Sequence, residues 1–322
     1  MKETVIRGNE MELLFAPLEG VTGYIYRNAH HKYYPGVVST YYAPFISPAK
    51  EKSMTPRELR DIVPHNNDGC VVPQILTNNV DYFSKCARKL CDMGYREINL
   101  NLGCPSGTVV AKGKGAGMLA DLDTLDAFLE TVFEAAKSEP YRISVKTRIG
   151  KTDPDEFYEL LPIFNRYPIE KLIVHPRIQK EFYKNKPRMA YVEYALKNST
   201  LNIIYNGDLI NNTDLEKVYT LYKQNNKEIS PVMIGRGLLM KPYGFADDNV
   251  DYDKLRAFHD ELLMGYREIM SGDKNTLYRM KELWTYLIAS FPDADKMAKQ
   301  IRKCESMESY NRIVDALFGG MK

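Results

Sequence analysis

Residues 97–106 read Glu-Ile-Asn-Leu-Asn-Leu-Gly-Cys-Pro-Ser, and a glycine-rich stretch, Gly-Lys-Gly-Ala-Gly, follows at residues 113–117. The first six residues alternate polar and apolar side chains, which predicts a β-strand with Asn99 and Asn101 on one face. This strand therefore ends where a loop with little side-chain bulk begins.

One cysteine, Cys104, stands at the end of this strand. A lone cysteine is most often a buried packing residue, and that interpretation stays open. The surroundings favour a reactive role, because Asn101 lies on the strand and two lysines, Lys112 and Lys114, lie on the loop that follows. A thiol between an amide and a basic loop is placed to act on a bound substrate.

Short apolar segments rich in β-branched residues alternate with amphipathic helical patterns along most of the chain. Eight such segments predict an α/β protein, a (β/α)8 TIM barrel. They cover residues 13–17, 37–42, 70–75, 97–102, 143–147, 171–175, 202–206 and 232–235. Helical patterns at 80–93, 124–138 and 212–223 lie between them.

Most of these segments end in a polar or glycine-rich group. The groups are Glu19, Gln74, Asn101, Lys146, His175, Asn206 and Gly235-Arg236-Gly237. In a TIM barrel the C-terminal ends of the strands build the active site. Scattered core polar residues would not fall so regularly at strand ends, so the pattern predicts one site at the barrel mouth.

The last part of the chain lacks strand patterns. Helical patterns cover 252–270, 275–290 and shorter pieces from 293 onward. We therefore expect two domains, a barrel over residues 1–245 and a domain of three or four helices over residues 246–322. The charges of the helical part nearly cancel, which argues against a generic polycationic tail.

Composition excludes several classes of protein. The net charge is +2, and no apolar run approaches membrane-spanning length. The N-terminal residues lack a signal-peptide pattern, and the five cysteines are odd in number and scattered, which indicates reduced thiols in the cytoplasm. No His/Cys/Asp spacing supports a metal site. The expected oligomeric state is a monomer.

Two glycine-containing tripeptides follow the last two predicted strands. They are Asn206-Gly207-Asp208 and Gly235-Arg236-Gly237. Either one alone would be only a turn. TIM barrels often bind phosphate with the loops after strands seven and eight, where glycines let backbone amides approach and an arginine adds a charged fork. Together the tripeptides predict a phosphate-bearing cofactor.

Lys146 closes the segment 143–147, where an unpaired ammonium group is costly to bury. Beside a flavin it would lie near the pyrimidine edge and stabilise the negative charge of the reduced ring. The alternative is a structural ion pair with a carboxylate such as Glu19. His175 is ambiguous by itself, since a single histidine is more often structural.

Basic residues cluster on loops at the same predicted face. Residues 177–188 contain Arg177, Lys180, Lys184, Lys186 and Arg188, with one acid, Glu181, and the aromatic pair Phe182 and Tyr183. Neighbouring loops carry Lys112, Lys114, Arg148 and Lys151. A cationic rim with aromatic side chains suits a phosphate backbone and an unstacked base. The alternative is an ordinary solvated loop.

On these residues the chain resembles the flavin-dependent tRNA-dihydrouridine synthase family over almost its whole length. The family's motifs appear in order. They are Ala16-Pro17-Leu18-Glu19-Gly20-Val21-Thr22, Pro73-Gln74, the run from Asn99 to Cys104-Pro105, Val145-Lys146-Thr147-Arg148, His175-Pro176-Arg177, Asn206-Gly207-Asp208 and Ile234-Gly235-Arg236-Gly237.

Within the family the chain is most similar to the bacterial C-type branch. That branch carries Pro-Met-Glu-Gly around the position of Glu19 and an Arg-x-Lys…Tyr signature for holding tRNA, which resembles the helix containing Arg279, Lys281 and Tyr286. The chain departs from the family pattern at Pro176, at Gly23 and over residues 178–188. These departures concern tRNA docking rather than the flavin site.

The resemblance implies FMN as cofactor, NADPH as reductant and tRNA as partner. It assigns FMN contacts to Pro17, Leu18, Glu19, Gln74, Lys146, His175, Asn206, Gly207, Asp208, Gly235 and Arg236. It places Asn101, Arg148, Tyr183, Arg279, Lys281 and Tyr286 against the tRNA, with Asn101 bonded to the uracil.

Cys104 then has a role in the implied reaction. Reduced flavin delivers hydride to one carbon of the C5=C6 bond of a D-loop uridine, and the adjacent carbon needs a proton. A thiol of ordinary pKa is protonated near neutrality and supplies it as a general acid. The uridine has to leave its stack to be reached. Two alternatives remain, a barrel flavoenzyme acting on a free pyrimidine and a catalytically silent RNA-binding barrel.

Overall fold

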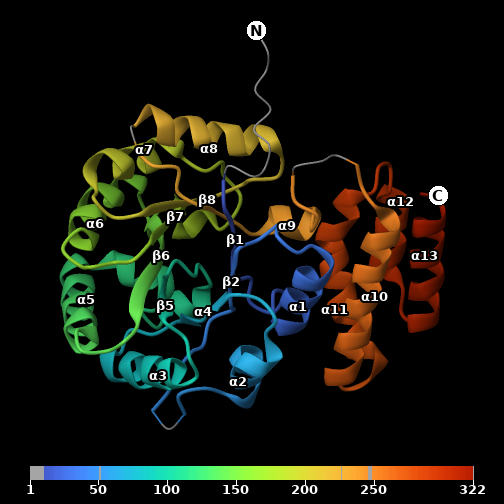
Figure 1. Ribbon diagram of the computed structural model, residues 1–322, viewed down its shortest axis with the longest axis horizontal. Helices are drawn as coiled ribbons and strands as arrows, with labels where there is room; N and C mark the ends of the chain where they lie inside the picture. The colour runs from blue at the N-terminus through green and yellow to red at the C-terminus, as the bar shows by residue number, and fades with distance from the viewer. Residues whose placement is uncertain (1–10, 51, 226, 246–248, 322) are drawn as a thin grey trace.

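The computed structural model describes residues 11–50, 52–225, 227–245 and 249–321. In these residues one sheet of nine parallel strands has the order β3-β2-β1-β9-β8-β7-β6-β5-β4. The strands are β1 (Leu13–Phe15), β2 (Thr40–Tyr42), β3 (Val71–Val72), β4 (Gln74–Ile75), β5 (Glu97–Leu102), β6 (Arg142–Gly150), β7 (Leu172–Ile178), β8 (Ile203–Asn206) and β9 (Val232–Ile234). Helices surround the strands, and the TIM barrel is confirmed (Figure 1).

The sheet closes on itself through the predicted strand at 70–75, which is divided into β3 and β4. Pro73 separates the two parts and has no backbone N–H to donate to a ladder. β3 pairs with β2 and β4 pairs with β5, while a bridge between Ile46 and Ile75 joins the two edges. The described residues therefore form nine strands, where the sequence predicted eight.

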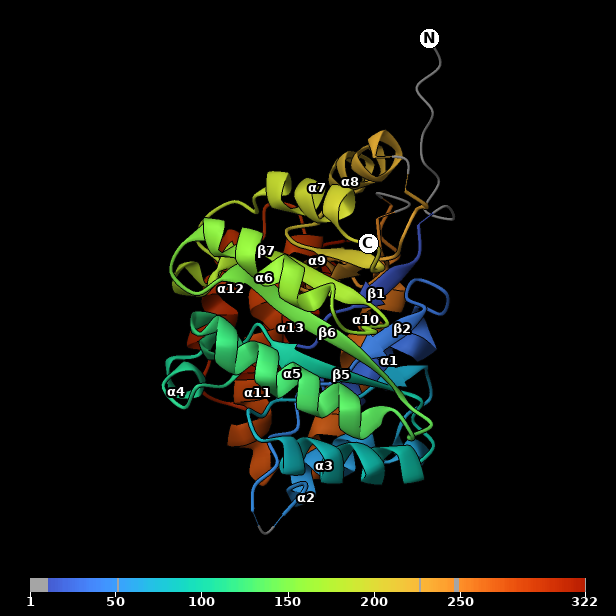
Figure 2. The same cartoon turned by 90° about the vertical axis from the view of Figure 1, so that its left-hand side faces the viewer.

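Helices follow the strands along the chain, and all but the last of them lie between two strands. They are α1 (Tyr24–Tyr33), α2 (Pro56–Ile62), α3 (Val80–Asp92), α4 (Gly107–Val110), α5 (Leu122–Ala136), α6 (Phe157–Phe164), α7 (Met189–Asn198), α8 (Asn212–Gln224) and α9 (Arg236–Met240). α3, α5 and α6 follow one another along the outside of β5 and β6 (Figure 2). The predicted helices at 80–93, 124–138 and 212–223 are confirmed. Side chains of Asn79, Asp121 and Asn211 cap their N-termini.

A layer of apolar side chains fills the inside of the barrel. It consists of Leu14, Ala16, Tyr42, Val72, Ile173, Ile204 and Met233. The Tyr42 hydroxyl donates to Glu97 at 2.9 Å, and Glu97 pairs with Lys171 at 2.5 Å near the amino ends of the strands. The inside of the barrel is therefore a packed core, and we expect a ligand to bind at its ends.

Four helices form a layer beside α1 and α9 (Figure 1). They are α10 (Tyr252–Ile269), α11 (Gly272–Leu287), α12 (Asp295–Lys303) and α13 (Met307–Gly319). α10 packs closely on α1, because a Cβ atom on Gly265 would lie 2.8 Å from Cγ2 of Ile25. The predicted boundary between residues 245 and 246 falls at 246–248, outside the described residues, so the division into domains stays a prediction.

In the described part of the chain, no helix combines the length and the apolar character needed to cross a membrane.

Candidate active site

The register of the sheet brings the predicted site residues together at the carboxyl ends of the strands. Paired residues are Gln74 with Asn99, Asn99 with Ser144, Asn101 with Lys146, and Arg148 with His175. Side chains two residues apart on a strand share a face, so one side of β5 and β6 carries a row of polar groups. The structure therefore brings these residues side by side in the barrel, and their role in a functional site stays a prediction.

A chain of side-chain amides holds the turn that carries Cys104. Gln74 donates from Nε2 to Oδ1 of Asn99, and Asn101 donates from Nδ2 to Oε1 of Gln74, both at 2.7 Å. Oδ1 of Asn101 accepts from the backbone N–H groups of Gly103 at 3.0 Å and Cys104 at 2.9 Å. Gln74 is fully buried, so in this structure it acts on the site through Asn101.

The glycine-rich loop after β5 packs directly against Cys104. Gly115 has a φ of +57°, and a Cβ atom there would lie 2.9 Å from Cβ of Cys104. Burial raises the pKa of the Cys104 thiol, while the Ser106 N–H and Arg148 act in the opposite direction. The pKa is therefore higher than the ordinary value expected from the sequence, which keeps the thiol protonated near neutrality.

Arg148 does not lie on the surface rim, which corrects the sequence prediction. Its side chain is 1% exposed and binds three backbone carbonyls, each at 2.9 Å. Nε donates to Gly103, Nη1 to Ile178 and Nη2 to Phe182. One guanidinium thus joins the Cys104 turn to the loop after β7.

Arg177 is also buried rather than on the rim, and its contact with His175 determines which nitrogen of the imidazole carries the proton. Arg177 donates from Nη1 to Nε2 of His175 at 2.9 Å and forms a two-point ion pair with Asp208. Because a guanidinium only donates, Nε2 accepts and the imidazole proton is on Nδ1. Burial, followed by Arg148 and Lys146, lowers the pKa of His175 well below its usual value, so the ring is neutral.

The basic rim is smaller than the sequence predicted. Arg188 is half-buried and pairs with the buried Glu181 at 2.5 Å, so it is not a free cation of the rim. Among the cations predicted on the rim, those whose side chains form no hydrogen bond or ion pair with the described residues are Lys112, Lys114, Lys151, Lys180, Lys184 and Lys186. A rim of lysines remains.

Lys146 has no counter-ion in the described part of the chain. Burial, and next the repulsion of Arg148, lower its pKa to about 7. Glu19 instead pairs with Arg57 of α2 at 2.6 Å, so the alternative of a Lys146–Glu19 ion pair is wrong. The unpaired ammonium group is the feature that a reduced, negatively charged flavin ring would satisfy.

The residues predicted to bind a cofactor phosphate lie after β8 and β9. Arg236 donates to Asp208 at 2.5 Å, and its guanidinium lies 4.7 Å from the ring centre of Tyr183. A Cβ atom on Gly207 would lie 2.0 Å from the hydroxyl of Tyr205, so only glycine fits there. Leu18, after β1, lies beside Gly235, after β9, so the predicted cofactor contacts of these two segments are next to each other. The donor set fits FMN, because it offers an arginine, a neutral histidine N–H and an unpaired lysine.

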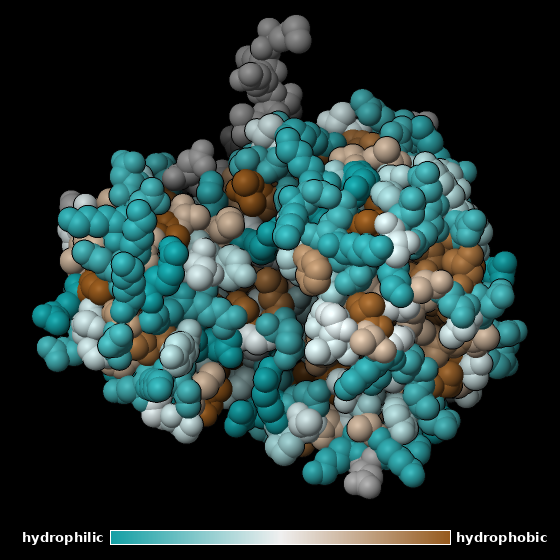
Figure 3. Space-filling view, turned by 180° about the vertical axis from the view of Figure 1, so that it is seen from behind, coloured by the Kyte–Doolittle hydropathy of each residue, from teal (hydrophilic) through white to brown (hydrophobic). Residues whose placement is uncertain are grey.

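The predicted tRNA contacts of the helical layer are bonded inside the protein. Arg279 donates to the carbonyl of Gly20 and to Glu282. Lys281 donates to the carbonyl of Cys304 at 2.7 Å, and Tyr286 is half-buried. Arg279 also lines a groove of about 540 Å³ that includes Glu19 and separates the β1–α1 loop and α2 from the facing ends of α10 and α11. Figure 3 shows the surface hollowed between the barrel and the helical layer.

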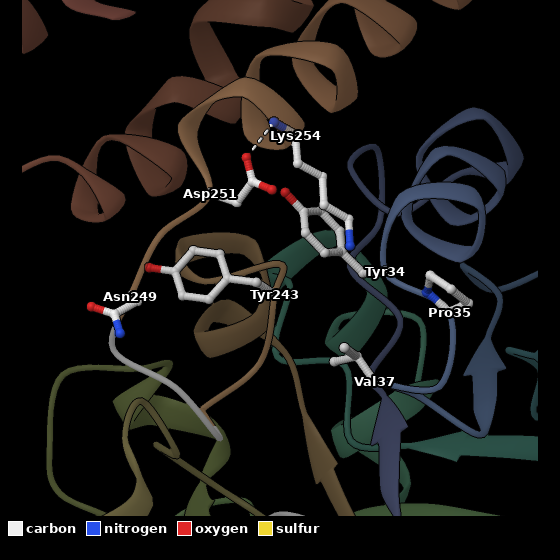
Figure 4. A pocket seen from close by; sticks show the side chains of 7 residues that line it. All are labelled: Tyr34, Pro35, Val37, Tyr243, Asn249, Asp251 and Lys254. Carbon is white, nitrogen blue, oxygen red and sulfur yellow. Dashed lines mark hydrogen bonds between the residues drawn. The ribbon is translucent and has the colours of Figure 1, made fainter. Parts of the chain in front are cut away.

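A smaller pocket of about 230 Å³ lies at the start of α10 (Figure 4). Its lining includes Tyr34 and Val37, which follow α1 and precede β2. The pocket is therefore near the amino ends of the strands, opposite the candidate site. The Lys254 N–H donates to Asp251, which caps α10.

Three residues of the site escaped the sequence analysis, or were misassigned by it. Ser144, which accepts from Asn99 at 2.8 Å, could have been found because it lies two residues before Lys146 on the same strand. Arg177 likewise lies two residues after His175. Arg57 gave no local signal, because it is distant in sequence from Glu19. No cluster of His, Cys, Asp and Glu in the described residues could hold a metal ion.

Comparison with known proteins adds independent evidence. The family model "Dihydrouridine synthase (Dus)" matches residues 14–314. A "Probable tRNA-dihydrouridine synthase" of Staphylococcus epidermidis is 27% identical over 251 residues, which cover 76% of this chain and 74% of that protein. A "Probable tRNA-dihydrouridine synthase 2" of Bacillus subtilis is 25% identical over 256 residues, covering 76% and 75%.

Among solved structures, histamine dehydrogenase from Rhizobium sp. 4-9 aligns with a TM-score of 0.53 at 8% identity, covering 94% of this chain and 61% of that chain. This similarity supports the fold alone.

Proposed function

Because the chain belongs to the dihydrouridine synthase family, we propose that it uses FMN and NADPH to reduce the C5=C6 bond of a D-loop uridine in tRNA, in the cytoplasm. The observation that carries this proposal is that one strand-end site contains both a protonated thiol, Cys104, and a lysine, Lys146, with no counter-ion among the described residues. The thiol supplies a proton and the lysine stabilises negative charge, which are the two needs of this reduction.

FMN, when bound, supplies the hydride that this chain's own side chains lack. Lys146 and the Nδ1–H of His175 would hold its ring, together with Pro17, Leu18 and Glu19, which follow β1. Asn206, Gly207, Asp208, Gly235 and Arg236 would hold its ribityl phosphate end. Arg236 is bonded to Asp208 in this structure, so the phosphate would share that arginine with the carboxylate.

Cys104 acts as the general acid toward the second carbon of the uracil double bond. Its raised pKa keeps the proton on Sγ until the reaction needs it. Asn101 fixes the turn through the Gly103 and Cys104 N–H groups and uses one amide hydrogen on Gln74. The other amide hydrogen of Asn101 is the donor we assign to the uracil.

The first experiment follows flavin and RNA chemistry separately. The purified protein should carry FMN, and NADPH oxidation should yield dihydrouridine in tRNA, detected by mass spectrometry. Cys104→Ala should leave flavin reduction by NADPH nearly unchanged and slow tRNA reduction about a hundred- to ten-thousandfold. Cys70→Ala, at an exposed free cysteine, is the matched control and should change neither.

The outcomes separate the rival functions. Reduction of free uracil or uridine at the rate seen with tRNA would favour a small-molecule pyrimidine reductase. Binding of tRNA without any flavin or dihydrouridine would favour a silent RNA-binding barrel. Normal tRNA reduction by Cys104→Ala would remove the thiol from the mechanism.

We propose that the helical layer docks tRNA through Arg279, Lys281 and Tyr286. The two cations are bonded to backbone carbonyls of Gly20 and Cys304, so RNA phosphates would have to compete with those contacts. If they do contact phosphates, replacing both with alanine should flatten the salt dependence of tRNA binding by at most about two units of slope. An unchanged slope would assign them to the fold alone.

A further inference from the structure

Phe182 has a backbone conformation that few residues other than glycine adopt. Its φ is +53°, in a region where a Cβ atom crowds the backbone. Such strain persists only where the surroundings enforce it, and it clusters at functional sites. Phe182 belongs to the aromatic pair of the predicted rim, and it has no role in the proposed reaction.

The two residues that hydrogen-bond to the backbone of Phe182, Arg148 and Gln179, also bind the Cys104 turn. Nη2 of Arg148 donates to the carbonyl of Phe182 at 2.9 Å, while Nε of the same arginine donates to the carbonyl of Gly103 at 2.9 Å. The Phe182 N–H donates to the carbonyl of Gln179 at 3.1 Å, and Gln179 in turn donates to the carbonyl of Pro105 at 2.8 Å. The strained residue is therefore tied to the residues on both sides of the proposed acid.

In its strained conformation Phe182 keeps an apolar ring exposed rather than buried. The Phe182 side chain is 42% exposed, and in the described residues its ring has no aromatic or cationic neighbour. Tyr183 differs, because the guanidinium groups of Arg148 and Arg236 lie 5.6 and 4.7 Å from its ring centre. Packing therefore does not explain the conformation of Phe182.

The charge around Phe182 indicates what its ring would meet. Three exposed lysines without side-chain partners in the described residues, Lys180, Lys184 and Lys186, surround it in sequence. The acid of this loop, Glu181, is buried and paired with Arg188. A free aromatic face among unpaired cations matches an unstacked base with phosphates on either side.

We propose that Phe182 is a stacking platform for an unpaired base of the RNA substrate next to the uridine being reduced. This proposal rests on the proposed function, since it assumes an RNA strand at the Cys104 turn. Stacking of one base on an aromatic side chain is worth about 5- to 150-fold in binding. The three lysines would take the flanking phosphates.

Phe182→Leu should raise the KM for tRNA about 5- to 150-fold, while Phe182→Trp should stay close to the wild type. NADPH oxidation in the absence of tRNA should not change in either variant. Tyr158→Leu is the matched control, because Tyr158 is an aromatic residue of similar exposure on α6, and it should leave the KM for tRNA unchanged. An unchanged KM in Phe182→Leu, in a protein that makes dihydrouridine, would overturn the proposal.

Two further readouts exclude a merely structural role. Trp284 is buried and is the one native tryptophan, so in Phe182→Trp the added, exposed indole should be quenched when tRNA binds. Phe182→Gly removes both the strain and the ring, so it should raise the melting temperature while raising the KM for tRNA. A structural residue would lower stability when removed, and that result would contradict the proposal. If the wild type makes no dihydrouridine, the proposed function fails, and the indole quench alone then decides whether a base stacks here.

Discussion

Arg148→Lys should destabilise the folded protein although it keeps the positive charge. The guanidinium of Arg148 reaches three carbonyls, on Gly103, Ile178 and Phe182, through three different nitrogens. A lysine ammonium is a single donor centre on a flexible stem and cannot span these separated acceptors. The substitution therefore leaves two carbonyls without their partner.

The expected loss in the free energy of unfolding follows from the two carbonyls that lose their partner. A buried polar group that loses its partner costs about 1–3 kcal/mol, which gives a range of about 2–6 kcal/mol for two. The contacts with Gly103 and Phe182 are only partly buried, so water replaces some of the loss there. We therefore expect the free energy of unfolding to fall by about 2–4 kcal/mol.

Urea unfolding followed by circular dichroism measures this loss, with Arg142→Lys as the control. Arg142 lies on the same strand, but its side chain is 67% exposed and pairs with Glu170 at 3.1 Å, so the same substitution should cost less than about 1 kcal/mol. Equal free energies of unfolding for the two variants would refute the role of Arg148 as the link between the Cys104 turn and the loop after β7.

Three further predictions concern other parts of the structure. The pKa of Lys146 is about 7 when folded against 10.5 ordinarily, so at pH values between these the unfolded chain binds a proton that the folded protein lacks. In the flavin-free protein, Lys146→Met should thus raise the free energy of unfolding most near pH 7 and hardly at all near pH 10.5. Urea titrations at the two pH values measure this difference, and an equal gain at both would contradict the prediction. Gln74→Leu should cost about 2–5 kcal/mol by the same assay, because two buried asparagine amides each lose a partner, and a loss below about 1 kcal/mol would show that the amide chain is not needed. The Tyr310 hydroxyl accepts from the Trp284 indole N–H at 2.7 Å and lies 2.6 Å from Nε2 of His259. Tyr310→Phe removes both contacts, so the melting temperature followed by Trp284 fluorescence should fall. An unchanged melting temperature would argue that these two hydrogen bonds do not stabilise the fold.

The periodicity of the sequence was sufficient to predict the barrel, and it brought the polar strand ends that form the candidate site to one face. Short β-branched segments alternating with amphipathic helices admit few architectures. The side chains at the strand ends converge because parallel strands of a barrel end at one face. Lys146, Asn101 and His175 were found in this way, since their positions relative to the strands are local properties of the chain.

The states of the charged residues could not be predicted in the same way. Arg148, Arg177 and Arg188 were expected on a solvated rim, yet the first two are buried and the third is paired with a buried carboxylate. Whether an arginine faces water or a carbonyl depends on which distant segments the fold brings beside it, and no local pattern records that.

What the sequence determined by itself is therefore the repeating strand–helix order, the polar strand ends and the membership of a family with a known motif series. The tertiary structure decided which of those polar groups have partners. It left Lys146 without a counter-ion in the part of the chain that the structure describes, joined Glu19 to Arg57 and held Phe182 at a positive φ. The physical reason is that pairing energies and desolvation depend on neighbours within a few ångströms, and those neighbours come from residues far apart along the chain.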